Sequence, residues 1–204
     1  MKGVLATLAF VLILGPPPAR AAEPLDGIYQ RLALYSTVCA DFVQTKTLRA
    51  LSRPLESRGR MVFVTGKGLL WQGRRPFPSQ LLVKRDSLIK WDEAGELQRV
   101  AFGQAPVFQT LSTVFFSVFT GDVARLGEVF DVTPMLGEQS WHMRLIPRDE
   151  AIAKIIATID ITGAQFVDML EIAEGRGDRT VIEFENVNGT TCHLDDAESI
   201  YFRQ

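Results

Sequence analysis

Short segments of alternating apolar and polar residues, separated by turn residues at intervals of roughly 8–12 positions, constrain the fold of this chain most strongly. Trp141, Met143 and Leu145, for example, alternate with the more polar His142 and Arg144. This alternation is typical of a sheet with one buried face. Strands are therefore expected at residues 39–49, 58–65, 68–73, 80–85, 87–92, 96–102, 129–133, 141–147, 155–161, 166–174, 179–186 and 190–194. Their close succession predicts one large antiparallel sheet, curled or partly closed, in a mainly β fold with some helix (α+β).

Two segments carry helical periodicity instead. Leucine, isoleucine and tyrosine recur at helical spacing in residues 24–37, and Pro24 suits the first turn of a helix there. Residues 108–119 read FQTLSTVFFSVF, with apolar residues on one helical face and polar residues on the other, and Gly121 is placed to end the helix. We interpret this second helix as a lid over the concave face of the sheet. The alternative is that its aromatic residues simply fill an ordinary core.

The first 21 residues have the pattern of a secretory signal peptide. Lys2 precedes an apolar run, and small residues at Ala19 and Ala21 suit cleavage after Ala21. The apolar run is too short to cross a membrane as a helix, and no cysteine follows it to accept a lipid anchor. We therefore expect a soluble periplasmic protein with a single domain at residues 22–204.

The charge of this expected mature chain argues against a nucleic-acid partner. Without Lys2 and Arg20, 20 basic residues face 24 acidic ones, which gives a formal charge of −4. No basic run is longer than a pair such as Arg74-Arg75. The sequence therefore lacks the phosphate-neutralising surface that nucleic acids require, and we expect a monomer that binds none.

Cys39 and Cys192 are the only two cysteines of the chain. Because disulfides persist in oxidising compartments, we favour a disulfide between them, with two buried free thiols as the alternative. A bridge that closes so long a loop would stabilise the fold by roughly 4–5 kcal/mol in the chain-entropy model.

The sequence offers no recognisable catalytic motif. His142 and His193 have no acidic residue at the spacing of a metal site or a catalytic triad. Cys192 and His193 are neighbours in an expected strand, so their side chains would point to opposite faces. Asp160 lies one residue too far from Thr162-Gly163 for an aspartic-protease motif. Neither an enzyme nor a cofactor is therefore expected.

Several short motifs, taken in order, resemble the LolA-like family of outer membrane lipoprotein carriers. They are Phe42-Val43-Gln44-Thr45-Lys46, Gly59 with the apolar strand around it, Trp71, Pro76 and the helix at residues 108–119. The resemblance covers most of the chain after residue 22. It implies an incomplete, half-open antiparallel β-barrel covered by helices, with an apolar interior that shelters acyl chains.

The resemblance also implies a binding site and partners. The expected ligand-binding residues are Met61, Phe63, Leu69, Trp71 and Trp91 on the sheet and Phe115, Phe116 and Phe119 on the lid. The expected partners are the acyl chains of a lipoprotein or another lipid, an inner-membrane donor protein and an outer-membrane acceptor protein. The implied function is transfer of this cargo between the two membranes.

One junction departs from the family pattern. The better-known carriers have a basic residue and a proline before the strand with the tryptophan, where this chain has Thr65-Gly66-Lys67-Gly68. A lysine offers a point charge in place of the planar fork of arginine. The cargo therefore stays open between a lipoprotein and a glycolipid or pigment lipid. Two other functions also stay open, namely a lipid- or lipoprotein-sensing binding module and a structural domain without a ligand.

Overall fold

The computed structural model describes residues 24–32, 35–91, 97–101, 103 and 106–203. The strands are β1 (Thr37–Thr47), β2 (Leu55–Val64), β3 (Gly68–Arg75), β4 (Ser79–Val83), β5 (Ser87–Trp91), β6 (Leu97–Ala101), β7 (Phe130–Leu136), β8 (Trp141–Pro147), β9 (Ile156–Gly163), β10 (Val167–Glu174) and β11 (Arg179–Asn188). The helices are α1 (Pro24–Arg31), α2 (Pro106–Thr120), α3 (Val123–Val129), α4 (Glu150–Ala153) and α5 (Asp196–Tyr201). The expected signal peptide at residues 1–21 lies outside the described residues.

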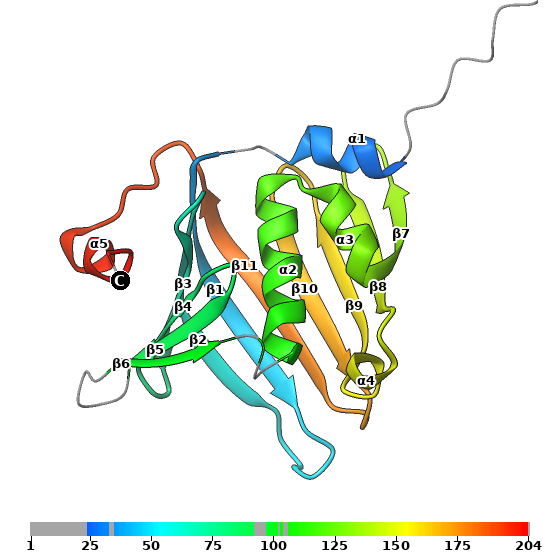
Figure 1. The fold of residues 1–204 in the computed structure, drawn as a ribbon, viewed down its shortest axis with the longest axis horizontal. Coiled ribbons are helices and arrows are strands. Elements are labelled where there is room, and N and C mark those ends of the chain that lie inside the picture. The colour runs from blue at the N-terminus through cyan, green and yellow to red at the C-terminus, as the bar shows by residue number, and fades with distance from the viewer. Residues whose placement is uncertain (1–23, 33–34, 92–96, 102, 104–105, 204) are drawn as a thin grey trace, which may run out of the picture.

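All of these strands form one antiparallel sheet that curves strongly. Its order is β6-β5-β4-β3-β2-β1-β11-β10-β9-β8-β7, so that β1 lies in the middle between β2 and β11. The sheet stays open between its edge strands β6 and β7, and α2 and α3, which connect these two strands, cover its concave side (Figure 1). This architecture confirms the expected half-open antiparallel β-barrel covered by helices.

The concave face of the sheet carries the main hydrophobic core. Strand alternation places Phe42, Met61 and Phe63 on this face, and each of them is almost completely buried. At one end of the sheet, Ile28 of α1 and Leu32, which directly follows this helix, join the same core (Figure 1). No helix among the described residues is long and apolar enough to span a membrane.

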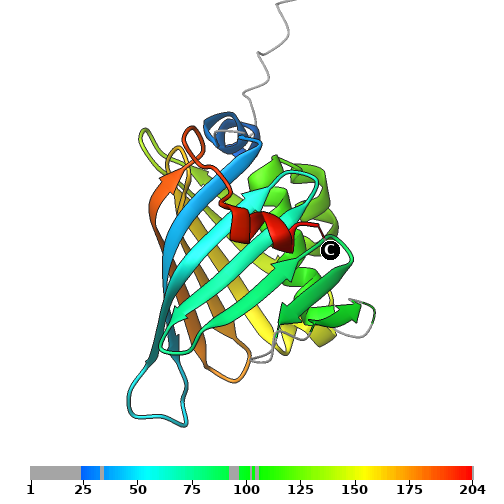
Figure 2. The ribbon, with the colours of Figure 1, turned by 90° about the vertical axis from the view of Figure 1, so that its left-hand side faces the viewer.

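A second apolar cluster, which we call the convex cluster, lies on the outside of the sheet. It consists of Cys39, Val62, Val64, Leu70, Leu82 and Ile89, packed against Trp91, Cys192, Leu194, Tyr201 and Phe202. The C-terminal segment, residues 191–203, provides the last four of these and ends in α5, which lies on the outer side of the strands (Figure 2).

Some expected elements differ from the structure. The first helix ends at Arg31, and Thr37 begins β1 instead of ending that helix. Residues 190–194 form no strand, because the chain leaves the sheet at the end of β11 and crosses the convex cluster toward α5. Helices α3, α4 and α5 were not expected, since 4–7 residues are too few to display a helical period.

Candidate functional site

An apolar cavity of about 440 Å³ lies between the concave face of the sheet and the N-terminal half of α2. Its apolar walls are formed by Leu69, Trp71, Leu81, Val83, Leu88, Ile156, Ile172 and Ile182 on the strands, Ile155 next to β9, and Val107, Phe108, Leu111 and Phe115 on α2. The volume lies within the range of about 300–1,000 Å³ that is typical of small-molecule pockets. At this end, the curved sheet therefore encloses more space than the side chains of α2 fill.

Aromatic rings stack at one wall of the cavity. The rings of Phe42 and Trp71 lie 3.8 Å apart between centroids, and Phe115 of α2 meets Trp71 edge-on at 6.2 Å. Gly59 faces Phe42 in the register of β1 and β2, and a Cβ atom at this glycine would lie 2.6 Å from the Phe42 ring. The missing side chain at Gly59 thus makes room for Phe42 to reach Trp71.

The structure brings only part of the expected ligand-binding residues to the cavity. Leu69, Trp71 and Phe115 line it. Met61, Phe63, Phe116 and Phe119 do not line it and belong to or pack against the buried core instead, where Phe63 lies against the C-terminal half of α2. There the rings of Phe63 and Phe119 stack with centroids 5.0 Å apart, so this half of α2 anchors the helix to the sheet.

The expected position of Trp91 in the ligand site is corrected by the structure, because this residue lies on the opposite face of the sheet from the cavity. In β5, Leu88 points into the cavity, so the alternation of the strand turns Ile89 and Trp91 outward. The Trp91 ring packs edge-on against Tyr201 of α5, with centroids 4.7 Å apart. This tryptophan belongs to the convex cluster and does not line the interior.

Apart from Ser112 of α2, the polar part of the cavity lining lies at one end, where β1, β11 and β10 lie side by side. Lys46 Nζ lies 3.1 Å from Glu174 Oε1, and the two side chains are 37% and 27% exposed. Gln44 and Thr180 lie beside them in the lining. Sequence reasoning quoted Gln44 and Lys46 as part of a family motif but assigned them no place in the site. Their spacing from Phe42 was the available signal, since every second residue of a strand shares a face.

Few polar contacts hold α2 on the sheet. The Ser112 hydroxyl donates a hydrogen bond of 3.2 Å to the backbone carbonyl of Lys84, in the turn between β4 and β5. In the same turn, the Arg85 guanidinium lies 5.7 Å from the centroid of the Phe116 ring. Of the expected polar side of α2, Ser112, Thr113 and Ser117 are buried, whereas Gln109 is exposed. The Thr113 hydroxyl bonds back to the α2 backbone at Gln109, which makes its burial tolerable.

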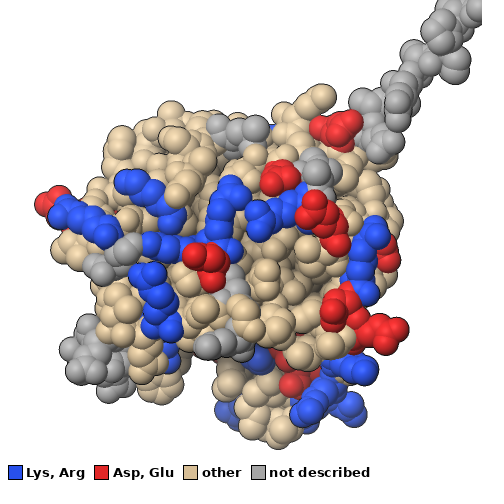
Figure 3. Space-filling view, in the orientation of Figure 1, with Lys and Arg blue, Asp and Glu red and all other residues tan. Residues whose placement is uncertain are grey.

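A basic hollow lies next to the C-terminal half of α2. Three basic residues and one acidic residue surround it together with two aromatic rings, and its volume is about 340 Å³; they are Lys67, Lys84, Arg85, Asp86, Phe116 and Phe202. Figure 3 shows basic side chains spread over the left part of this face, whereas its lower right carries both signs of charge. Lys67, at the junction that departs from the family pattern, therefore lies outside the cavity lining.

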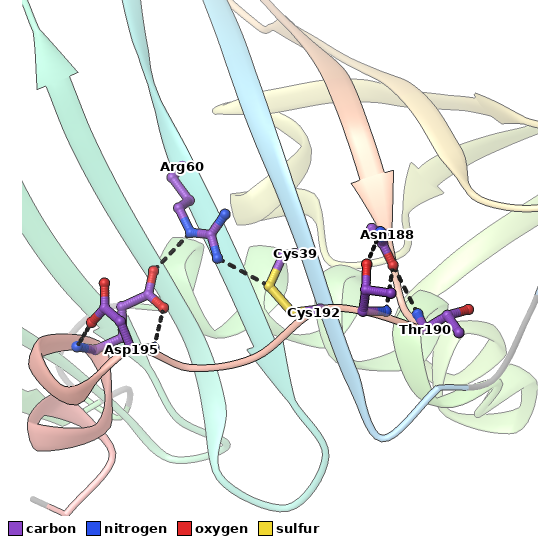
Figure 4. Close-up of a disulfide and its surroundings, with 8 residues drawn as sticks. Cys39, Arg60, Asn188, Thr190, Cys192 and Asp195 are labelled. Atoms are coloured by element: carbon purple, nitrogen blue, oxygen red, sulfur yellow. Dashed lines mark hydrogen bonds and ion pairs between the residues drawn. A yellow bond between two sulfur atoms is a disulfide. The ribbon is translucent and has the colours of Figure 1, made fainter.

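The C-terminal segment is fastened to the convex face by several bonds (Figure 4). A disulfide joins Cys39 of β1 to Cys192, with Cα atoms 5.6 Å apart. Arg60 of β2 donates a hydrogen bond of 2.7 Å to the buried carboxylate of Glu198, and a second one of 3.3 Å to Cys39 Sγ. Asp195 and Glu198 form a capping box at the start of α5.

The remaining convex face, on β8 and β9, carries charged pairs. His142 Nε2 lies 2.6 Å from Asp160 Oδ1, and Arg144 donates hydrogen bonds to both oxygens of the same carboxylate. Burial would raise the pKa of Asp160, but the hydrogen bonds from Arg144 and His142 outweigh it and lower the pKa. The described residues include no group of three or more His, Cys, Asp or Glu that could hold a metal ion.

Comparisons with known proteins agree with this architecture. The sequence model of a family described as outer membrane lipoprotein carrier protein LolA-like matches residues 17–187. Comparison with curated protein sequences found no match.

Solved structures with a similar fold share little sequence with this chain. A LolA superfamily protein from Nitrosomonas europaea is 9% identical, with a TM-score of 0.49 over 85% of this chain and 94% of that one. A DUF1329 family protein from Desulfovibrio piger is 11% identical, with a TM-score of 0.45 over 89% and 98%. The MucA/MucB complex from Pseudomonas aeruginosa contains a chain that is 13% identical, with a TM-score of 0.48 over 87% and 60%. No ligand or partner is inferred from these identities.

Proposed function

The chain belongs to the LolA-like family of outer membrane lipoprotein carrier proteins, and from this premise we propose that it is a periplasmic carrier. It shelters the acyl chains of a lipoprotein or another lipid in its apolar cavity while this cargo moves from the inner to the outer membrane. An inner-membrane donor protein and an outer-membrane acceptor protein exchange the cargo with it. The expected signal peptide at residues 1–21 supports the periplasmic location.

The observation that carries the proposal is the apolar cavity under α2. Apart from Ser112 of α2, its lining is apolar except at the end with Lys46 and Glu174, and the rings of Trp71 and Phe115 meet edge-on at its wall. A structural domain without a ligand would be expected to fill this space, because protein interiors are close-packed. A cavity of this size next to a well-packed half of the same helix favours a ligand.

The same cavity provides the binding affinity that a carrier needs. Burial of an acyl chain gains about 0.8 kcal/mol per methylene, so a chain of a dozen carbons gains roughly 10 kcal/mol at most. Transfer requires that this binding be reversible. The contact between Ser112 and the Lys84 carbonyl holds the cavity half of α2 by one neutral hydrogen bond, which is worth only about 1 kcal/mol. A small displacement of α2 can therefore open the cavity without unfolding the sheet.

Native mass spectrometry of the mature protein purified from its own periplasm tests the proposal. We expect a bound lipid or acylated molecule, which organic extraction then identifies. Phe115→Glu places a carboxylate in the cavity and should leave the protein folded and secreted but empty. Gln109→Glu is the matched control on the same helix, because this side chain is exposed and does not line the cavity.

Two results would contradict the carrier. One is a wild-type protein that is empty as purified and also fails to bind a fluorescent fatty acid. The other is an equal ligand occupancy of the wild-type protein and the Phe115→Glu variant, which would place the ligand elsewhere on the molecule.

A further inference from the structure

The cavity opens at the end where its lining becomes polar. Phe108 of α2 and Ile155 before β9 both line the cavity, yet they are 47% and 48% exposed. The Lys46–Glu174 ion pair lies at the same end, and its side chains are also partly exposed. At the other end, Trp71 and Leu69 are surrounded by the buried core. The lining therefore runs from apolar inside to charged at the mouth.

This gradient fixes the orientation of a ligand. An amphiphile that enters through the mouth buries its chain against Trp71 and Leu111 and leaves its head group beside Lys46 and Glu174. The reverse orientation would place the polar head group in apolar surroundings, where unpaired polar groups are costly.

The volume sets the number of chains. If one methylene takes up about as much space as a water molecule does in the liquid, roughly 30 Å³, a cavity of about 440 Å³ has room for roughly 15 methylenes. That is enough for one common acyl chain. A second chain would require α2 to move away from the sheet.

The charges at the mouth select the head group. Among the described residues that line the cavity, Lys46 and Glu174 are the charged ones, and their charges cancel. A purely anionic head group would approach Lys46 but would be repelled by Glu174, and a purely cationic one would meet the opposite problem. A zwitterionic head group can pair its anionic part with Lys46 and its ammonium with Glu174. Partly exposed ion pairs contribute little to stability, so exchanging one for two new pairs is easy.

Building on the proposed function, we infer that the cavity binds a single-chain amphiphile with a zwitterionic head group, whose two charges take the places of the Lys46–Glu174 partners at the mouth. Lys46 and Glu174 thus determine head-group specificity, while the apolar walls supply the affinity.

Isothermal titration of the delipidated mature protein tests this inference with three probes that each carry one chain of about 14 carbons, all below their critical micelle concentrations. These are lysophosphatidylethanolamine, lysophosphatidylglycerol and tetradecyltrimethylammonium, with zwitterionic, anionic and cationic head groups. We expect the wild-type protein to bind the zwitterionic probe at least about tenfold more tightly than either charged probe.

Variants of the ion pair sharpen the test. Glu174→Gln leaves Lys46 alone at the mouth and should shift the preference to the anionic probe, whereas Lys46→Gln should shift it to the cationic one. The double variant should bind all three probes with similar affinity. Glu171→Gln is the matched control, since Glu171 is paired with Arg179 on the outer face of the same strand. It should keep the wild-type preference.

The outcomes separate the inference from the proposed function. If the wild-type protein binds none of the three probes, the carrier itself is wrong. If it binds all of them equally, or if Glu174→Gln and Lys46→Gln leave the order of affinities unchanged, the carrier stands and the zwitterionic specificity is wrong. Circular dichroism establishes that each variant is folded before its affinities are compared.

Discussion

The cavity and the convex cluster are apolar surfaces on opposite faces of the same sheet, but the chain covers them in different ways. The convex cluster is covered by a segment that is bound through a disulfide, the Arg60–Glu198 ion pair and a hydrogen bond from the Tyr201 hydroxyl to Gln80. The cavity is covered by one half of α2, which reaches the adjacent turn through a hydrogen bond from Ser112. The first cover is fastened covalently and the second is not.

This difference separates stability from function. A segment that covers an apolar surface permanently is best held by a covalent bond, because its position then does not depend on packing alone. Apolar surface that must accept and release a ligand needs a cover whose movement is inexpensive. The sheet provides a rigid wall between the two, so a change on one face is expected to leave the other largely intact.

The two tryptophans on these faces allow the most direct test of this separation, and the largest effect is expected there. Trp71→Glu buries a carboxylate at the cavity wall, which is unfavourable by several kcal/mol, so acyl-chain binding should be lost by well over tenfold. Trp91→Glu is the matched control on the convex face, where the ring packs on Tyr201. It should lower stability but retain binding. The measurement is titration with a fluorescent fatty acid, and equal binding by both variants would break the comparison.

Removal of the disulfide tests the permanent cover. The double variant Cys39→Ser/Cys192→Ser should lower the free energy of unfolding by about 2–5 kcal/mol, because a long loop in the unfolded chain is no longer closed. Urea unfolding measures this change. We expect the fatty-acid affinity of the folded variant to stay within about twofold of the wild type, because the disulfide and the cavity lie on opposite faces of the sheet. Coupled sites would change the affinity more, since coupling free energies are typically about 1–3 kcal/mol. A variant with unchanged stability and lost binding would reverse the assignment of the two faces.

The alternation of apolar and polar residues was sufficient to predict most of the sheet. The prediction failed for residues whose position in the fold is not determined by their neighbours in the sequence. Trp141, Met143 and Leu145 face the core as their spacing predicts. Trp91 was misplaced because it was judged by its type and not by the parity of its strand, in which Leu88 faces the cavity. In the C-terminal segment the expected strand at residues 190–194 was wrong, since the position of this segment depends on contacts with distant strands such as the one between Tyr201 and Gln80.

The site was less predictable than the fold for a similar reason. Leu69, Trp71 and Phe115 do line the cavity, but the filled half of α2 around Phe116 and Phe119 was not distinguished from the half over the cavity. Where a cavity remains depends on how far a helix lies from a curved sheet, and residue types alone do not specify that distance. The Lys46–Glu174 pair joins two strands that are far apart in the sequence, so no local motif predicts this pairing.

The contact between α2 and the β4–β5 turn tests the reversible cover, with an intermediate effect. Ser112→Ala removes the hydrogen bond to the Lys84 carbonyl, which is worth about 1 kcal/mol, and should speed ligand release roughly fivefold. Thr113→Ala is the control, because the Thr113 hydroxyl bonds only within α2. Stopped-flow release of a bound fluorescent fatty acid measures both. If the two variants release the ligand equally fast, the contact with the turn does not hold the cover.

The charged pairs on β8 and β9 give the smallest expected effect, and they sharpen the comparison by showing a part of the convex face without the C-terminal cover. Burial opposes the ionised form of Asp160, but the hydrogen bonds from Arg144 and His142 lower its pKa below the ordinary value. A carboxylate with a lowered pKa adds stability above its unfolded pKa of about 3.9 and loses that stability as the pH falls through the folded value.

Asp160→Asn should therefore lower the thermal midpoint slightly at pH 7, and the difference from the wild type should disappear in strongly acidic solution. The effect stays small because the Arg144 side chain is 53% exposed and water screens its charge. Thermal unfolding of both proteins from neutral to acidic pH measures it. A difference that persists unchanged at acidic pH would assign the loss to packing instead of charge. A loss as large as that of the disulfide variant would mean that this exposed region, like the convex cluster, depends on a specific fastening.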